Sequence, residues 1–119
     1  MVERKEILIQ GGVYLARLDP AKAAEVGKIR PVIVLNAQPI LDVIPPIIFI
    51  CPLSSQSHPA FASLHIKLLP RDNLQVDSFA LVEHCRSIST RRIVHPRLAH
   101  IHPAELDAIF HALQRLLGM

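Results

Sequence analysis

The sequence predicts a mainly β protein with one helix at its C-terminus, built as a small antiparallel β-barrel or curled sheet. Residues 30–36 and 47–53 are apolar runs of strand length that are rich in β-branched side chains. Residues 62–69 alternate between apolar and polar side chains, which is the two-residue period of a strand. Only residues 103–117 repeat apolar side chains at intervals of three and four, as a helix does. Strands first and one helix last favour this fold class.

Size and composition indicate a single domain that spans residues 1–119. Half of the residues are hydrophobic but only 4% are aromatic, so the core is expected to be aliphatic. Few aromatic residues also argue against an open platform on which nucleic-acid bases stack. The net charge of +3 is compatible with a polyanionic partner without requiring one.

The sequence indicates a cytoplasmic protein. No apolar run approaches the roughly 20 residues that span a bilayer, and the N-terminus does not resemble a signal peptide. Cys51 and Cys85 form no CxxC motif, and we expect both to be reduced, buried and small apolar members of the core.

The first half of the chain is expected to begin with a short strand within residues 1–10. Residues 12–18 alternate, with Tyr14, Ala16 and Leu18 on one face of a strand, and Asp19-Pro20 ends it. A charged loop then leads to residues 30–36, a strand that we expect to be central because both of its faces are apolar. The proline-rich residues 37–46 are expected to form a connection without regular structure.

The second half is expected to contain four strands and the helix. Residues 47–53 form a buried strand, and residues 62–69 form a strand near the sheet edge, with His65 and Lys67 facing solvent. The remaining elements are expected to be a strand at 77–83, a short helical turn at 90–96, a last strand at 98–101, and the helix, which begins at Pro103 and ends before Gly118.

Glu25, Lys28 and Arg30 surround Gly27 in the charged loop before the central strand. Pro31 forces the backbone of Arg30 into an extended conformation, so its guanidinium sits where the loop becomes rigid sheet. A carboxylate and two cations placed together can hold a phosphodiester and move protons. The alternative is an ordinary charged surface loop.

Two further clusters follow strand ends. Ser54 and Gln56 come directly after the buried strand 47–53, where a hydroxyl is suited to donate to a phosphate oxygen or simply to form a turn. Glu83, His84 and Arg86 close the strand at 77–83 and place a titratable imidazole between a carboxylate and a guanidinium. The alternative for this second cluster is a polar strand end on the surface.

We expect neither a metal nor a cofactor. His95, His100 and His102 lie close together in the sequence, but no HExxH, CxxC or carboxylate-rich pattern accompanies them. The chain also contains no phosphate-binding loop of the G-x-x-x-x-G-K-S type and no dinucleotide fingerprint.

Three segments together resemble the MazF/PemK-type toxins of bacterial toxin–antitoxin pairs. Residues 11–36, which read G-G-V-Y-L-A-R-L-D-P-A-K-A-A-E-V-G-K-I-R-P-V-I-V-L-N, match the opening strand and the L-D-P…E-x-x-G-x-R-P segment of that family. Residues 52–55, P-L-S-S, match its P-[IVL]-T-[ST] strand end. Residues 83–88, E-H-C-R-S-I, match its [DE]-Q-x-[RK]-[TS]-I segment.

The resemblance implies an SH3-like barrel of the type shared by MazF, PemK and CcdB toxins, and a homodimer. It implies metal-independent cleavage of single-stranded RNA, with Arg30, Ser54 and Glu25 at the family's catalytic positions. The resemblance also implies that an acidic, partly disordered antitoxin tail covers the surface that binds RNA. We expect substrate contacts from a further set of residues, namely Lys28, Gln56, Glu83, His84 and Arg86.

The reaction that these residues favour is attack of a ribose 2′-OH on the adjacent phosphorus, which leaves a 2′,3′-cyclic phosphate and a 5′-OH end. Arg30 would stabilise the charge on the phosphorane and Ser54 would add a neutral donor. The base is either Glu25, which matches the family, or His84, whose usual pKa suits the task better.

The chain also departs from the family pattern. Ala23, Ala24 and Val26 replace polar residues of the family's loop, and His84 replaces its glutamine. Two alternatives therefore stay open: a catalytically weakened relative, or a toxin on the same barrel that acts through protein contact alone, as gyrase poisons do.

Overall fold

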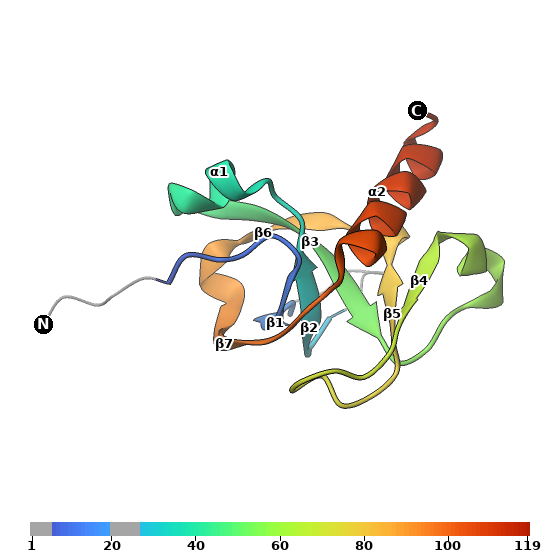
Figure 1. The fold of residues 1–119 in the computed structure, drawn as a ribbon, viewed down its shortest axis with the longest axis horizontal. Helices are drawn as coiled ribbons and strands as arrows, with labels where there is room; N and C mark the ends of the chain where they lie inside the picture. The colour runs from blue at the N-terminus through green and yellow to red at the C-terminus, as the bar shows by residue number, and fades with distance from the viewer. Residues whose placement is uncertain (1–5, 20–26) are drawn as a thin grey trace, which may run out of the picture.

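One antiparallel sheet of seven strands forms the framework of the protein (Figure 1). The computed structural model describes residues 6–19 and 27–119. The strands are β1 (Gly12–Arg17), β2 (Ile29–Val34), β3 (Ile47–Ser54), β4 (His65–Leu68), β5 (Ser78–Leu81), β6 (Arg86–Ser89) and β7 (Ile93–His100). The helices are α1 (Gln38–Asp42) and α2 (Pro103–Leu117), with three 3₁₀ turns, η1 (Pro59–Leu64), η2 (Val82–His84) and η3 (Thr90–Arg92). The predicted mainly β fold with a C-terminal helix is confirmed.

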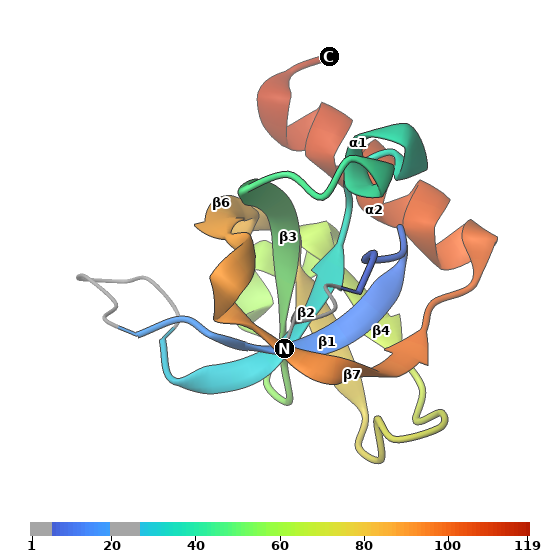
Figure 2. The same ribbon diagram turned by 90° about the vertical axis from the view of Figure 1, so that its left-hand side faces the viewer.

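Strand β3 is the centre of the sheet. The strands follow the order β4-β5-β3-β2-β1-β7, and β6 pairs with β3 outside this path. The first half of β3 pairs with β6, and its last two residues, Leu53 and Ser54, pair with β5. Turned by 90° (Figure 2), the sheet curls into an open barrel with α1 and α2 above one end. Because β3 joins three strands, its C-terminal end is held in a fixed position.

Two hydrophobic clusters lie on opposite faces of β1, β2 and β3, because successive strand residues point to opposite sides. One cluster is covered by α2 and includes Ile33, Leu53 and Ile109. The other includes Tyr14, Ala16, Leu18, Val32 and Ile50. Tyr14, Ala16 and Leu18 therefore share a face as predicted. The second half of β2, Val32 to Val34, is buried on both faces as expected for a central strand, whereas Ile29 at its start is exposed.

Helix α2 begins and ends as the sequence predicts. Pro103 is its first residue, and the Glu105 carboxylate accepts a hydrogen bond from the His102 backbone N–H at 2.7 Å. Gly118 ends it with a left-handed φ of 74°, a conformation that costs glycine little. The predicted apolar stripe is buried at Ile109, but Leu117 in the last turn is 66% exposed.

Several element predictions differ from the structure. Residues 6–9 form no strand, and residues 1–5 of that predicted strand lie outside the described residues. The connection at 37–46 contains helix α1, in whose first turn Pro39 is tolerated. The helical turn predicted at 90–96 is limited to η3, because residues 93–100 form the continuous strand β7. Pro96 lies within this strand, which is compatible with a strand at the end of the sheet order.

Two strands are shorter than predicted. The strand expected at 62–69 contains only β4, because η1 occupies residues 59–64, and β4 lies at one end of the sheet order as expected for an edge strand. The strand expected at 77–83 ends at Leu81, where η2 begins. Both shortened strands have a 3₁₀ turn at one end, and η2 places the Glu83 side chain against His65 of β4.

Cys51 is buried on β3, as predicted, whereas Cys85 is half-buried. A hydrogen bond with the Cys85 thiol and burial together raise the pKa of Cys51 well above its ordinary value. Both cysteines are free, as expected. No helix within residues 6–19 and 27–119 has the length and hydrophobicity of a membrane-spanning segment.

Candidate active site

Arg30 and Ser54 lie on neighbouring strands at one end of the sheet. Val32 of β2 is paired with Pro52 of β3, and continuing this antiparallel register by two residues places Arg30 opposite Ser54. Arg30 also contacts the residue before Ser54, because Arg30 Nη1 donates to the backbone oxygen of Leu53 at 3.3 Å. The structure thus brings together two residues that the sequence predicts to be catalytic, although they are far apart along the chain.

The Arg30 guanidinium is oriented by neutral acceptors. Its Nε donates to the Gly27 backbone oxygen at 3.1 Å, and its Nη1 donates to that of Leu53. Among the described residues, no carboxylate forms a salt bridge with Arg30, and the side chain is half-buried. The guanidinium is therefore held in place while its positive charge and several N–H donors stay available to an anion.

The Ser54 hydroxyl is also oriented. Its Oγ accepts a hydrogen bond from the backbone N–H of Gln56 at 3.1 Å, a local turn that serine commonly makes. Since that bond uses an oxygen lone pair, the hydroxyl hydrogen is free to be donated. Gln56 itself is exposed in the loop that follows β3.

A row of four side chains crosses the sheet at the level of Ser54. Phe79 of β5 is paired with Ser54 on one side and with Lys67 of β4 on the other. Residues that lie opposite one another share a face of the sheet and are about 4.8 Å apart along the row. The row is therefore Arg30, Ser54, Phe79 and Lys67, and we call it the β2–β4 row. Sequence reasoning missed Phe79 and Lys67 as site residues because strand register cannot be read from the sequence.

Lys28 lies at the end of the loop that precedes β2. Its backbone has a φ of 65°, which is unusual for a residue other than glycine. Its N–H donates to the Asp19 carboxylate at 2.6 Å, and its carbonyl accepts from Leu18 N–H at 2.8 Å. These bonds join Lys28 to Leu18 and Asp19 across the two ends of the segment. Lys28 is exposed, two positions before Arg30. Glu25 lies outside the described residues.

His65 corrects one expectation. It was predicted to face solvent, but its side chain is only 2% exposed. The ring lies between Ser57 Oγ, 2.6 Å from Nδ1, and the Glu83 carboxylate, 2.7 Å from Nε2. These two partners come from the loop after β3 and from η2, neither of which is apparent in the alternating pattern of residues 62–69.

Glu83, His84 and Arg86, which were predicted to close the strand at 77–83, lie in different surroundings. Glu83 is turned toward His65, with its side chain 16% exposed. His84 is half-buried at the end of η2, and Arg86 is half-buried in β6 opposite Ile50. Their contact with a substrate stays a prediction.

Histidines expected not to bind a metal have other partners. His95 Nδ1 lies 3.0 Å from the Glu6 carboxylate, and His100 contacts the backbone oxygens of Gln10 and Ile101. Within the part of the chain that the structure describes, no three His, Cys, Asp or Glu side chains converge as metal ligands would.

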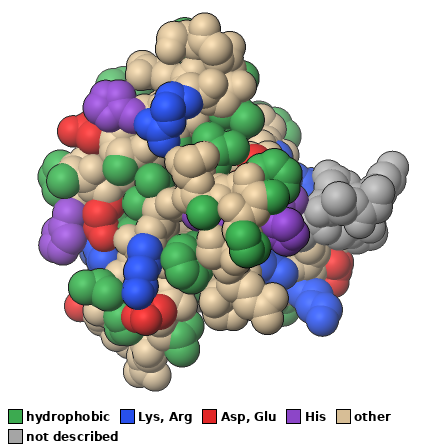
Figure 3. All heavy atoms as spheres, turned by 90° about the vertical axis from the view of Figure 1, so that its right-hand side faces the viewer, with side chains coloured by type: hydrophobic (Ala, Val, Ile, Leu, Met, Phe, Trp, Pro, Cys, Tyr) green, Lys and Arg blue, Asp and Glu red, His purple; other side chains and the backbone are tan. Residues whose placement is uncertain are grey.

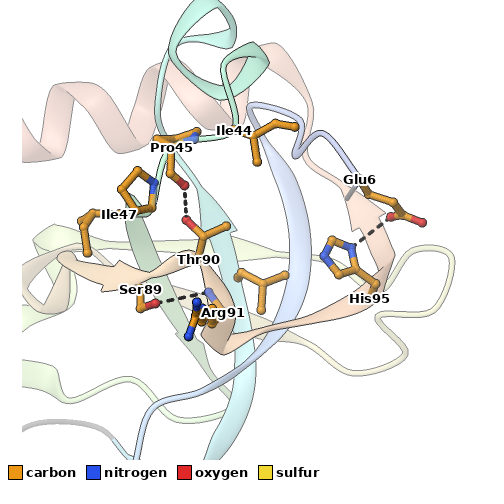
Figure 4. Close-up of a pocket in the computed structure, with 10 residues that line it drawn as sticks. Glu6, Ile44, Pro45, Ile47, Ser89, Thr90, Arg91 and His95 are labelled. Carbon is orange, nitrogen blue, oxygen red and sulfur yellow. Dashed lines mark hydrogen bonds and ion pairs between the residues drawn. The ribbon is translucent and has the colours of Figure 1, made fainter. Parts of the chain in front are cut away.

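A separate apolar groove of about 730 Å³ lies between the α1–β3 connection and β7 (Figure 4). Ile44, Pro45 and Ile47 form one wall, and His95 stands with Glu6 at the other. Thr90 also lines the groove, and its Oγ1 donates to the Pro45 backbone oxygen at 2.6 Å. The lining includes neither Arg30 nor Ser54, so this groove is distinct from the β2–β4 row.

Charges of both signs are interspersed on the surface. The face on the side of β4 carries Lys and Arg side chains separated by acidic and hydrophobic ones rather than one continuous basic patch (Figure 3). The net charge is also only +3. This distribution favours binding of an anionic ligand by a few oriented cations rather than by a broad basic surface.

Comparison with known proteins gives a consistent result. Residues 9–117 match the family model described as PemK-like, MazF-like toxin of type II toxin-antitoxin system. The chain is 28% identical to Endoribonuclease EndoA of Bacillus subtilis (strain 168) over 114 residues, which cover 95% of this chain and 97% of that protein.

Solved structures agree with this match. MazF from Deinococcus radiodurans superposes with a TM-score of 0.79 and 25% identity, covering 97% of this chain and all of that one (100%). A MazE–MazF structure from the same organism matches with a TM-score of 0.76 and 23% identity, covering 97% and 99% of the two chains. The family model covers the strands, the site and the C-terminal helix, and the chain therefore belongs to the PemK-like, MazF-like toxin family of type II toxin–antitoxin systems.

Proposed function

We propose that this protein is the toxin of a type II toxin–antitoxin system and acts in the cytoplasm as a sequence-specific endoribonuclease on single-stranded RNA, mRNA above all. The observation that carries the proposal is the register of β2 and β3, which when extended places Arg30 opposite Ser54, together with the bond from the Arg30 guanidinium to the Leu53 carbonyl. Membership of the toxin family and the 28% identity to a protein named as an endoribonuclease support it.

The proposed reaction is an in-line attack of a ribose 2′-OH on the adjacent phosphorus. The bond between phosphorus and the 5′ oxygen breaks, leaving a 2′,3′-cyclic phosphate and a 5′-OH end. Arg30 holds the non-bridging oxygens, whose negative charge grows in the phosphorane, and Ser54 donates a second hydrogen bond. Preorganised donors of this kind contribute about 3 kcal/mol each to transition-state stabilisation.

The 2′ proton goes to Glu25 or His84, and the departing 5′ oxygen takes a proton from the other of these two side chains or from water. Glu25 matches the family position, and its loop leads directly to Gly27, whose carbonyl orients Arg30. His84 is half-buried at the end of η2 and has an imidazole suited to general-base catalysis near neutral pH. The reaction uses no metal step, because side chains supply both the charge stabilisation and the proton transfer.

The β2–β4 row extends the substrate contacts away from the scissile phosphate. Phe79 offers a face on which the neighbouring base stacks, and Lys67 lies one strand further, where it meets the next phosphate. Lys67 is 3.8 Å from Asp77, but both side chains are more than half exposed, so this ion pair is easily exchanged for a phosphate contact. Lys28, Gln56 and Arg86 complete the proposed contacts.

The protein is proposed to be a homodimer through the apolar groove beside α1. Large apolar side chains are exposed there, with Val43 at 75%, and they continue through Ile44 and Ile47 into the groove wall. Exposed patches of this kind mark protein interfaces. A second copy would cover this surface and leave Arg30 and Ser54 accessible.

The dimer is tested by Val43→Glu, which places a charge in the centre of the apolar surface. Sedimentation of wild type should give twice the monomer mass, and of the variant the monomer mass. Val76→Glu is the matched control, since Val76 is also exposed but lies far from the groove in the sequence. A dimer that persists in Val43→Glu would contradict this interface.

An acidic, partly disordered antitoxin tail is proposed to occupy the RNA site. The similar Deinococcus radiodurans structure contains MazE with MazF, which supports an antitoxin partner here. An acidic peptide should therefore displace labelled RNA from the protein, with a competition curve that reaches full displacement. Simultaneous binding of peptide and RNA would contradict a shared site.

The function itself is tested by incubating the purified protein with a long RNA in the presence of EDTA. Primer extension should map cuts to one short sequence, and the products should carry 2′,3′-cyclic phosphate and 5′-OH ends. Cuts that require a divalent metal, or products with 5′-phosphate ends, would contradict the mechanism. Intact RNA would favour a toxin that acts through protein contact or a weakened enzyme.

A further inference from the structure

Three polar side chains from separate elements form a continuous hydrogen-bonded line beside the loop that follows β3. Ser57 Oγ lies 2.6 Å from His65 Nδ1, and His65 Nε2 lies 2.7 and 2.9 Å from the two oxygens of Glu83. Ser57 belongs to the loop, His65 opens β4, and Glu83 lies in η2. We call this arrangement the His65 bridge.

Burial makes the His65 bridge rigid. The His65 side chain is 2% exposed and that of Glu83 is 16% exposed. A carboxylate only accepts hydrogen bonds, so Nε2 carries a proton, and in the neutral ring Nδ1 accepts the Ser57 hydroxyl hydrogen. Both ring nitrogens are thus satisfied, as a buried imidazole requires. Rotation of the ring would break both bonds at once.

The bridge reaches Ser54 through the backbone. Ser57 is three positions after Ser54, and between them the Gln56 N–H donates to Ser54 Oγ at 3.1 Å. A fixed position of Ser57 therefore restrains the neighbouring Gln56 amide. Because that amide donates to Ser54 Oγ, it also restrains the orientation of the Ser54 hydroxyl. The Ser54 hydroxyl hydrogen then has a restricted set of directions in which it can be donated.

We propose that His65 and Glu83 are positioning residues for Ser54. They anchor the loop at Ser57 so that the Gln56 amide holds the Ser54 hydroxyl ready to donate to the phosphate. This inference rests on the proposed function of Ser54. It gives Glu83 a role through His65 rather than through contact with RNA.

The geometry favours an anchor over a second, nucleophilic serine. In serine hydrolases the serine contacts Nε2 of the histidine and the acid contacts Nδ1. Here the ring is reversed, with Ser57 at Nδ1 and Glu83 at Nε2. Ser57 also lies in the loop itself, so its bond to His65 anchors the loop to β4, as a positioning role requires.

The first test does not depend on RNA cleavage. Amide hydrogen exchange of Gln56, measured by NMR, should become at least about tenfold faster in Ser57→Ala and His65→Ala, because the loop loses its anchor. His58→Ala is the matched control: its ring accepts from Ala60 N–H at 3.2 Å in the same loop, outside the bridge. Unchanged Gln56 exchange in Ser57→Ala, which keeps the His65–Glu83 contact, would overturn the proposal.

The second test uses single-turnover cleavage of RNA. His65→Ala should lower the cleavage rate roughly 10- to 100-fold with little change in the RNA concentration at half-saturation, since misplaced catalytic groups cost about this much. His65→Gln, which keeps a donor and an acceptor, should recover part of the rate. In a Ser54→Ala background, His65→Ala should have no further effect. An equal loss in both backgrounds would overturn the role of His65 as a positioning residue.

The two tests separate this inference from the proposed function. If wild-type protein cuts no RNA, the proposed function fails, and the Gln56 exchange still decides whether the bridge holds the loop. If wild-type protein cuts RNA but Gln56 exchange is insensitive to the bridge, only the inference fails.

Discussion

Arg71 and Arg30 lie at different places in the fold and differ in whether a carboxylate among the described residues neutralises the guanidinium. Arg71 lies in the turn after β4, where the Glu105 carboxylate at the start of α2 receives both of its Nη groups, one of them at 2.7 Å. Arg30, at the end of β2, is oriented by the carbonyls of Gly27 and Leu53. Arg71 is thus part of a bidentate ion pair, whereas the contacts of Arg30 within the described residues leave its charge uncompensated.

This difference in partners indicates that Arg71 has a structural role and that Arg30 is suited to bind an anionic ligand. The half-buried Arg71–Glu105 ion pair fixes the turn against α2 but has no uncompensated charge to offer a ligand. A guanidinium held by neutral carbonyls is oriented without being neutralised, as the binding of a phosphate requires.

The largest effect is expected from Arg30→Ala. Loss of the guanidinium should slow RNA cleavage about 10²- to 10³-fold or more, with a melting temperature close to that of wild type, because its bonds within the described residues go to backbone carbonyls. Arg115→Ala is the matched control, since Arg115 is exposed on α2 and also bonds to a carbonyl, that of Ser63. A similar loss of cleavage in both variants would show a nonspecific effect of charge.

Arg71→Ala should give the opposite pattern, lower stability with cleavage of RNA retained in the folded fraction. The expected loss is about 2 kcal/mol in the free energy of unfolding, because a largely buried carboxylate loses its charged partner. Thermal unfolding of wild type, Arg71→Ala and Arg71→Lys measures it. A cleavage defect that is larger than the stability defect would remove the contrast with Arg30.

The Arg71–Glu105 pair also gives stability a pH dependence. Burial raises the pKa of Glu105, but the hydrogen bonds from Arg71 and from the His102 N–H outweigh it, so the pKa lies below the ordinary value of 4.5. The stabilisation is therefore complete above about pH 5 and is lost as pH falls through the lowered pKa. Glu105→Gln should flatten the unfolding free energy in this acid range. An unchanged slope would contradict the lowered pKa.

Phe79→Ala tests the β2–β4 row. Loss of the aromatic face should weaken RNA binding by about 1–2 kcal/mol, with a smaller change in the rate at saturating RNA. Phe79→Leu is the matched control, because it keeps the apolar bulk beside Ser54 without a ring. Equal binding by the Leu variant and wild type would contradict stacking.

The smallest effect is expected at Lys28. Its φ of 65° is strained for lysine, so Lys28→Gly should be more stable than Lys28→Ala by about 1 kcal/mol. Both variants lose the same charge and should bind RNA equally weakly. Chemical denaturation and RNA titration of the two variants separate backbone strain from charge.

The sequence predicts much of the framework for identifiable reasons. The continuous apolar runs at 30–36 and 47–53 indicate buried strands, and Pro103 with Gly118 marks the helix ends. The α1 helix and the long β7 are less apparent, because prolines at 39 and 96 mask them. Prolines restrict the local backbone, but the first turn of a helix and an edge strand accept them.

The candidate site is only partly predictable. Arg30 and Ser54 follow from their family motifs, and the register of β2 and β3 brings them together. Phe79, Lys67 and the His65 bridge depend on pairings across β3, β5 and β4, which leave no local pattern. His65 even appears as a solvent-facing residue in the alternating segment, since alternation does not reveal that Ser57 and Glu83 cover it.

If Arg30 and Ser54 act on one phosphate as a unit, a double-mutant cycle of single-turnover RNA cleavage will show that their effects are coupled. Ser54→Ala alone should slow cleavage about 100-fold, whereas adding it to Arg30→Ala should cost less than about threefold. Independent action would instead give the same factor for Ser54→Ala in both backgrounds, and that result would contradict the account.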